Sequence, residues 1–320
     1  MKLLDNFKWI NDCGSKARKK AIQNAETAYK RFFKGQSRFP RFKKKSKSDV
    51  KIYFPKNNKG DWKVERHRIM IPTLKNVRIK EYGYIPIGAK VISGTVSKKA
   101  DRYYVSVIVD VDIPVVKNTN EGIGIDLGLK DFAICSDGNT YKNVNKTQKI
   151  RKIEKRLKRE QKKLSRKYKF LKKKGGTATK SNINKQIVKV QRLHHKLNNI
   201  RTNYINKTIS RIVNQKPRFI TIEDLNIKGM MKNKHLSKAV ASQKFYEFRN
   251  KLTNKCNVLG IELRIVDRFY PSSKLCHCCG SIKKDLKLKE RIYKCDCGYI
   301  EDRDYNASLN LRDAKIYKTA

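Results

Sequence analysis

The sequence is short of acidic residues and of long apolar runs. Of its 320 residues, 28 are Asp or Glu and 78 are Lys or Arg, so the formal net charge is +50. No stretch approaches the run of about eighteen apolar residues that a membrane-spanning helix needs, and no cleavable signal pattern stands at the start. A chain this positive repels itself unless it binds a polyanion, so nucleic acid is the expected partner.

An anionic membrane surface is the alternative polyanion. The basic residues are spread over the whole length and no lipid-anchoring motif is present, so we expect no membrane partner. Eight cysteines without a secretion signal indicate a reducing compartment, which favours metal ligation over disulfides. The expected location is therefore the cytoplasm.

Four cysteines form two closely spaced pairs near the C-terminus. Cys276 and Cys279 make a C-x-x-C pair, Cys295 and Cys297 make a C-x-C pair, and a glycine follows each pair. This spacing suits a backbone that folds around a metal, so the four thiolates predict a tetrahedral structural Zn²⁺. A disulfide pair is the alternative, but the glycines would have no role in it. Cys278 is an alternative to Cys279, and the second pair is one residue tighter than usual.

The first third of the chain is expected to be one helix followed by β structure. Aromatic and apolar residues recur at helical intervals over residues 1–35, and Gly35 ends the helix. Short runs rich in strand-forming residues then predict a small twisted barrel or sheet over residues 36–115, with a hairpin turn at residues 98–101.

The segment between that helix and the β structure interleaves aromatic residues with cations. A solvated loop is one interpretation of this pattern. The other is contact with phosphate groups, with aromatic rings available for stacking. The candidate nucleic-acid-binding residues in the segment are Arg41, Lys43, Lys44 and Lys45.

Residues 116–272 are expected to form a second domain of strands and helices. Apolar residues at steps of three, four or seven predict an antiparallel helical hairpin over residues 148–214, whose cationic outer face favours nucleic-acid contact. The other expected elements are strands at 122–128, 132–135, 140–141, 218–224 and 261–266, a helix at 237–258, and a last helix that starts near Asp304.

Three acidic residues occupy comparable places in these elements. Asp126 and Glu223 each close an apolar strand, and Asp304 stands where the last helix begins. Acidic residues are depleted in strands, so one that closes an apolar strand often points into a site, although a single one is more often a surface residue. Asp224 and Asp302 are adjacent alternatives.

This order of strands and helices is the one by which the RNase H-like fold gathers carboxylates from separate segments. The expected fold class is therefore α+β with an α/β, RNase H-like domain, preceded by a helical segment and a small β-barrel-like domain. Three carboxylates that repel one another stay ionised only if cations neutralise them. They suit two Mg²⁺ or Mn²⁺ ions about 3.5–4 Å apart, as in phosphodiester cleavage.

Four motifs together resemble one known family. In combination they are specific to the TnpB (OrfB) family, insertion-sequence-encoded RNA-guided DNA nucleases that are related to the type V CRISPR effectors. The resemblance covers about residues 20–313. The motifs are Gly124-Ile125-Asp126-Leu127-Gly128, Ile222-Glu223-Asp224-Leu225, Pro271-Ser272-Ser273-Lys274-x-Cys276 and Asp302-Arg303-Asp304-x-Asn306-Ala307.

The resemblance implies a RuvC-type nuclease domain that is split by a zinc ribbon at residues 273–300 and that ends, with a C-terminal tail, at residues 301–320. It implies that residues 36–115 are a wedge-like domain. Residues 1–35 would be the remnant of a helical recognition insert, because family members usually begin well upstream of this point. The resemblance thus implies an N-terminally shortened chain.

The resemblance also implies partners, cofactors and site residues. The implied partners are a guide RNA transcribed from the element's own end and a target DNA, in a prokaryotic cytosol close to the nucleoid. The resemblance implies that Asp126, Glu223 and Asp304 are the catalytic residues and bind Mg²⁺ or Mn²⁺. The four paired cysteines would bind structural Zn²⁺. The expected function is that of a metal-dependent, RNA-guided DNA endonuclease associated with a transposable element and accessory to transposition.

Two other functions fit part of the sequence. A nuclease-inactive or decayed family member would bind DNA under RNA guidance without cutting it, but all three acidic positions are present. A zinc-ribbon RNA-binding protein without catalysis would account for the charge and the cysteines. It would leave the acidic residues at the strand ends without a role.

Overall fold

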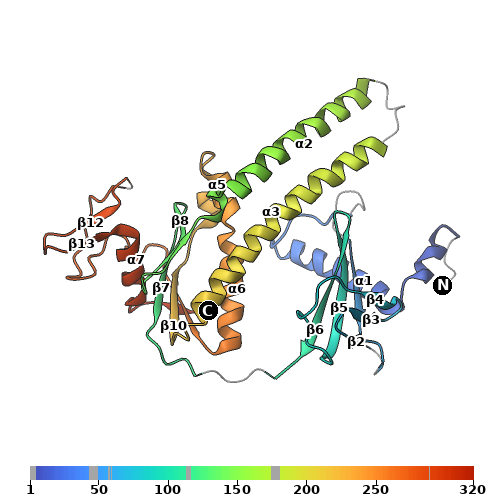
Figure 1. The fold of residues 1–320 in the computed structure, drawn as a ribbon, viewed down its shortest axis with the longest axis horizontal. Helices are drawn as coiled ribbons and strands as arrows, with labels where there is room; N and C mark the ends of the chain where they lie inside the picture. Colours follow the sequence, from blue (N-terminus) through green and yellow to red (C-terminus); the bar gives the residue numbers. More distant parts are fainter. Residues whose placement is uncertain are drawn as a thin grey trace. The chain divides into compact units, whose positions relative to one another are not determined.

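The computed structural model describes residues 5–42, 50–56, 58, 60–112, 117–173, 181–287 and 289–320. The chain divides into two units, Met1–Asp112 and Ile113–Ala320, and Figure 1 labels most of their elements. Across the described ranges, no helix combines the length and the apolar character that crossing a membrane requires.

Two helical pieces begin the first unit, so the prediction of a single helix over residues 1–35 is wrong. A 3₁₀ helix (η1, Asp5–Asp12) precedes α1 (Ser15–Phe33), and Gly14 between them has φ −53° and ψ 137°. A residue with this extended ψ cannot continue a helix, so the chain changes direction there. Gly35 has φ 67° and ends α1, as predicted.

Two three-stranded antiparallel sheets make up the rest of the first unit. They enclose Trp62, whose ring lies so close to Gly94 that a Cβ there would come within 2.2 Å of it. The predicted hairpin turn is present, since Lys99 pairs with Arg102 across it. The sheets have the orders β1-β5-β6 and β2-β3-β4, and the strands are β1 (Val50–Pro55), β2 (Lys63–Val64), β3 (Arg68–Ile71), β4 (Lys75–Arg78), β5 (Lys90–Lys99) and β6 (Arg102–Asp110).

A six-stranded mixed sheet organises the second unit. β7, β8 and β9 follow one another antiparallel, and β10 then lies beside β7 and parallel to it, with β11 parallel on its other side. This agrees with the predicted order of strands. The antiparallel edge strand β14 was not predicted. The strands are β7 (Ile123–Leu127), β8 (Asp131–Cys135), β9 (Thr140–Lys142), β10 (Phe219–Glu223), β11 (Glu262–Val266) and β14 (Lys318–Thr319).

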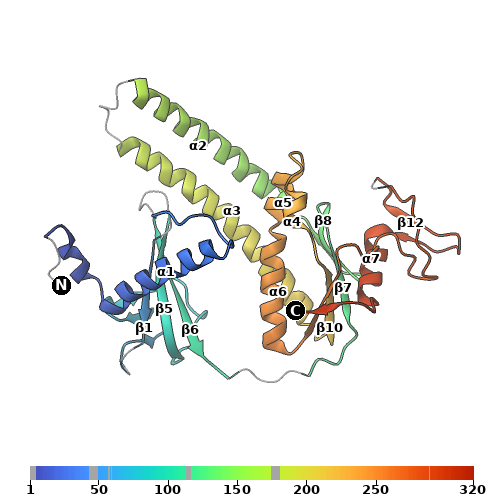
Figure 2. The ribbon, with the colours of Figure 1, turned by 180° about the vertical axis from the view of Figure 1, so that it is seen from behind.

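Two long helices form the predicted hairpin between β9 and β10. α2 (Gln148–Lys173) and α3 (Ser181–Val213) run side by side in Figure 1 and in the reverse view of Figure 2. Apolar residues at helical spacing form the seam between them, so the predicted periodicity is confirmed. The buried residues of this seam are Ile150, Ile153, Leu157, Val190, Leu193 and Leu197.

The helix predicted over residues 237–258 is interrupted at Lys244, which has a left-handed backbone with φ 59°. The Nζ group of Lys244 donates to the side chains of Asn198 and Thr202 on α3, at 2.9 and 2.8 Å. These bonds hold the interruption against the hairpin, and periodicity alone could not reveal them. The helices in this segment are α4 (Ile227–Met230), α5 (Ser237–Gln243) and α6 (Phe245–Leu259).

Helices cover both faces of the sheet. α3 and α6 lie on one face and α7 (Arg303–Arg312) on the other (Figures 1 and 2). Ile123 and Ile125 of β7 belong to the core shared with α3 and α6, so Gly124 between them faces α7. A Cβ at position 124 would lie 2.0 Å from the carbonyl oxygen of Ser308. Glycine is therefore required for this approach of α7 to β7.

Gly124→Ala is expected to displace α7 and to lower the free energy of unfolding of the second unit by about 2–3 kcal/mol, because helix backbone must move. The melting temperature should fall by about 5–10 °C, measured by circular dichroism in the helix band. Both tryptophans, Trp9 and Trp62, lie in the first unit, so their fluorescence transition is an internal control that should not move. An unchanged helical transition would contradict the close approach.

Candidate active site

Two of the predicted acidic residues stand beside each other on neighbouring parallel strands. Ile125 of β7 pairs with Ile222 of β10, so the residues that follow, Asp126 and Glu223, lie at the same level near the carboxyl ends of their strands. Side chains alternate along a strand, so Asp126 shares the face of Gly124, on which α7 lies. Both acidic residues are half-buried.

The third predicted residue, Asp304, lies in the first turn of α7. Asp302, its alternative, caps this helix, because one of its carboxylate oxygens accepts the backbone N–H groups of Asp304 and Tyr305 at 3.0 and 3.1 Å. Asp304 instead makes ion pairs, at 3.2 Å with Arg303 and 3.5 Å with Arg291. The two aspartates therefore have different surroundings.

Electrostatic interactions join Asp304 to the strand-end residues. The pKa of Asp126 is raised to about 7, first by burial and then by the charges of Asp304 and Glu223, while Arg303 opposes the rise and Asp302 contributes least. Burial is also the main cause that raises the pKa of Glu223 to about 7. Both shifts favour the protonated form of these carboxyls, so the ionised form that binds a cation needs nearby positive charge to offset the burial. Carboxylate oxygens are the ligands that Mg²⁺ prefers. Among the described residues, however, the group whose ligand atoms all lie close enough to hold one metal ion together is formed by four cysteines, so the three carboxylates would have to approach one another further to share an ion.

Asp224, the alternative to Glu223, is engaged by two arginines. Arg249 on α6 donates to one of its carboxylate oxygens, and Arg268, which follows β11, donates to the other at 3.0 Å. Burial acts to raise the pKa of Asp224, but these hydrogen bonds lower it overall. Glu223 makes no such ion pair with the described residues, so the two neighbouring acids have different surroundings.

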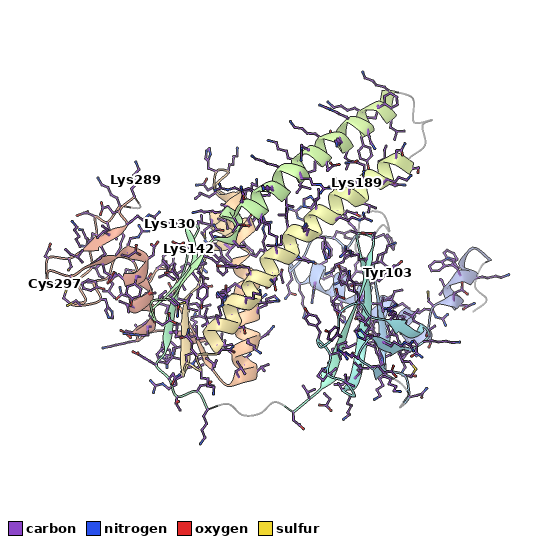
Figure 3. The ribbon with its side chains drawn as sticks, in the orientation of Figure 1. Tyr103, Lys130, Lys142, Lys189, Lys289 and Cys297 are labelled. Carbon is purple, nitrogen blue, oxygen red and sulfur yellow. The ribbon has the colours of Figure 1, made fainter. Side chains whose placement is uncertain are left out.

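The four predicted zinc ligands come together in the ribbon between β11 and α7, where Figure 3 labels Cys297. The sulfurs of Cys276 and Cys297 lie 3.7 Å apart, and those of Cys279 and Cys295 lie 3.6 Å apart. Tetrahedral Zn²⁺ with bonds of about 2.3 Å requires sulfurs about 3.8 Å apart, whereas disulfide sulfurs lie about 2.05 Å apart. The cluster therefore fits zinc, and the exposed Cys278 lies outside it. The ribbon strands are β12 (Ile292–Lys294) and β13 (Ile300–Asp302).

A hydroxyl group that the sequence analysis missed lies against two of these sulfurs. Ser281 Oγ is 3.1 Å from Cys279 Sγ and 3.2 Å from Cys295 Sγ. Hydrogen bonding by Ser281 is the largest cause that lowers the pKa of Cys295 to about 6, and it also lowers that of Cys279. Zinc binds the thiolate form, so Ser281 supports the metal-binding state. Cysteine spacing carries no signal for such a residue.

Two buried asparagines on α7 join the ribbon to this helix. The Asn306 side chain donates to the Leu275 carbonyl at 2.8 Å and accepts the His277 N–H at 3.2 Å. The Asn310 side chain donates to the carbonyls of Ser272 and Leu275 at 2.8 and 2.7 Å. Asn306 was recognised in the sequence only as part of a motif, and the pattern of this mostly polar helix does not single out Asn310.

Among the predicted nucleic-acid-binding residues, Arg41 is exposed, whereas Lys43, Lys44 and Lys45 lie outside the described residues. The cationic face that was predicted for the helical hairpin is present. Basic residues that share one side of α2 line an open depression on its surface: Lys152, Lys155, Arg156, Lys158, Arg159 and Lys162.

Comparison with known proteins identifies the family. A family model described as "Probable transposase" (OrfB of IS605) matches residues 104–234, and a "Cas12f1-like, TNB domain" model matches residues 245–311. A protein of Escherichia coli (strain K12) named "Putative RNA-guided DNA endonuclease InsQ" is 30% identical over 95% of this chain and 75% of its own length. The chain belongs to the TnpB/OrfB family.

Other known proteins are also similar to this chain. A Streptomyces pristinaespiralis protein, also named as an RNA-guided DNA endonuclease, is 29% identical over 100% of this chain and 76% of its own length. The CRISPR-associated endodeoxyribonuclease Cas12f1 of Sulfoacidibacillus thermotolerans is 23% identical over 94% and 76%. Among solved structures, a Cas12f1–sgRNA–target DNA complex matches with a TM-score of 0.49 and 19% identity, over 84% of this chain and 60% of that one.

The cysteine geometry predicts different outcomes for two adjacent thiols. Cys279→Ser should lose zinc, because it removes one of four ligands, whereas Cys278→Ser should keep about one zinc per chain. The measurement is elemental analysis of protein purified without added chelator. If the Cys278 variant lost zinc and the Cys279 variant kept it, Cys278 would be the ligand in place of Cys279.

Proposed function

We propose that the chain is a metal-dependent, RNA-guided DNA endonuclease of a transposable element, which hydrolyses DNA phosphodiester bonds. The observation that carries this proposal is that Asp126 and Glu223 stand side by side on two parallel strands, with Asp304 at the start of a helix and close enough for its charge to raise the pKa of Asp126. Membership of the TnpB/OrfB family, and the names of its relatives, support the DNA substrate and the guide RNA.

In this proposal the three carboxylates bind two Mg²⁺ or Mn²⁺ ions. The ions, when bound, lower the pKa of the attacking water and stabilise the departing oxygen. The protein holds the ligand oxygens at one edge of the sheet, and ion pairs with Arg303 and Arg291 restrain Asp304. Zn²⁺ in the ribbon would be structural, and the hydrogen bonds from Asn306 and Asn310 would transmit its ordering effect to α7.

The proposed domains follow from this arrangement. Residues 116–272 and 301–320 form an RNase H-like, RuvC-type nuclease domain, interrupted by the zinc ribbon at residues 273–300. Residues 36–115 act as a wedge-like domain and residues 1–35 as part of a recognition insert. The proposed partners are a guide RNA from the element's own end and a target DNA, which suit a net charge of +50.

Asp126→Ala, Glu223→Gln and Asp304→Asn are each expected to slow DNA cleavage about a hundredfold or more, because each removes a ligand of the catalytic metal. RNA affinity should stay within about twofold, since Lys and Arg hold the phosphates. Asp302→Asn is the matched control, because asparagine also caps helices, and it should retain cleavage. Plasmid cleavage and filter binding at one fixed salt concentration measure the two properties.

Three results would contradict the proposal in different ways. An active Asp304 variant beside an inactive Asp302 variant would exchange these two residues. A wild-type chain that binds RNA and DNA but does not cut with Mg²⁺ or Mn²⁺ would favour the nuclease-inactive alternative. Random fragments among the co-purified RNA, in place of one defined transcript, would argue against guidance.

A further inference from the structure

Two arginines lie beside the proposed carboxylate cluster and are held by one acid. Arg249 comes from α6 and Arg268 from the segment after β11, and each donates a hydrogen bond to a different oxygen of Asp224. The two guanidinium groups are therefore neighbours. Together with Asp224, which directly follows the last residue of β10, Glu223, they carry one net positive charge.

These arginines remain available to a ligand. Their side chains are 38% and 43% exposed, so solvent and ligands reach both guanidinium groups. Each guanidinium has five N–H donors, and among the described residues each uses one on Asp224. The N–H donors that remain on each planar guanidinium group match the oxygens of a phosphate group. Asp224 orients both guanidinium groups before any ligand binds.

A cavity of about 220 Å³ lies directly against this pair. Its lining also includes Glu223, one of the three proposed metal ligands, whereas Asp126 and Asp304 are not part of the lining. Tyr246 lines the cavity with 67% of its surface exposed, so one part of its ring is open to solvent. Asn226 and Lys228 complete the polar part of the lining, so the ionised side chains around the cavity are three basic and one acidic.

We propose that this cavity is a subsite for one nucleotide of the DNA strand that is cut, next to the scissile phosphate. A backbone phosphate would lie between Arg249 and Arg268, and the attached base would stack on Tyr246. The proposal rests on the proposed nuclease function. We favour a nucleotide of single-stranded DNA as the ligand, because an exposed aromatic ring beside phosphate-binding arginines stacks on an unpaired base.

The phosphate contact can be tested on single-stranded DNA in which one phosphate at a time is replaced by a neutral methylphosphonate. The chain with its co-purified RNA should lose roughly tenfold or more in kcat/KM at one linkage close to the cut. On natural DNA, kcat/KM of the Arg268→Gln and Arg249→Gln variants should fall by a similar factor. Replacing the phosphate at that linkage should then lower their kcat/KM no further. Arg268→Lys, which keeps the charge but not the planar guanidinium group, should recover only part of the rate.

Matched control variants distinguish contacts within the subsite from the general effect of removing a surface charge or an exposed ring. Arg102→Gln, an exposed arginine on β6, should keep the full methylphosphonate penalty. Tyr246→Ala should raise KM roughly tenfold, whereas Tyr103→Ala, with 70% exposure, should not. Circular dichroism melting confirms that each variant is folded. A penalty that stays undiminished in both arginine variants would overturn the phosphate contact.

A second measurement keeps the subsite testable if the wild-type chain does not cut DNA. DNA carrying 5-iododeoxyuridine is irradiated with the Asp126→Ala protein, and cross-linked peptides are identified by mass spectrometry. A cross-link at Tyr246 that is lost in the Tyr246→Ala, Asp126→Ala double variant supports the stacking contact. Absence of this cross-link overturns the subsite, while absence of cleavage by the wild-type chain contradicts only the nuclease function.

Discussion

The contact of α7 with β7 at Gly124 is the constraint on which the candidate site depends. Position 124 has no Cβ, so helix backbone lies against strand backbone there. This brings the first turn of α7, with Asp304, to the face of β7 that carries Asp126. The buried face of the same helix holds the ribbon through Asn306 and Asn310. One ten-residue helix therefore connects the cysteine cluster to the carboxylates.

Acidic residues are scarce in this chain, and those around the site have separate contacts. Asp302 stabilises the first turn of α7 by capping it, and Asp224 holds two arginines in place. Asp126 and Glu223 make neither kind of contact with the described residues, and burial raises the pKa of both. Sequence position alone could not distinguish the roles of neighbouring acidic residues such as Glu223 and Asp224, because the arginines that bind Asp224 come from distant segments.

The sequence predicted the elements that have a clear apolar pattern. The hairpin α2–α3 follows from apolar residues three or four positions apart, and the strands from Ile123 to Cys135 and up to Glu223 follow from short apolar runs. β2 and β14 have two residues each, too few to show a period. The interruptions at Gly14 and Lys244 depend on local backbone geometry and, for Lys244, on partners in α3. Ser281 and Asn310 act through tertiary hydrogen bonds that no spacing encodes.

The helical hairpin also bears on how the chain reaches this structure. The sheet needs β10 beside β7, yet the chain between Lys142 and Phe219 would form a long loop if it lacked structure, and closing a loop costs entropy that grows with its length. α2 and α3 pair through contacts close in sequence, which form early and bring the two ends of the insertion together. Once the hairpin has formed, β10 pairs with β7 by closing only a short connection. During synthesis, the sheet could assemble from β7 to β11 before α7 exists, so the carboxylate cluster would stay incomplete until α7 has been made.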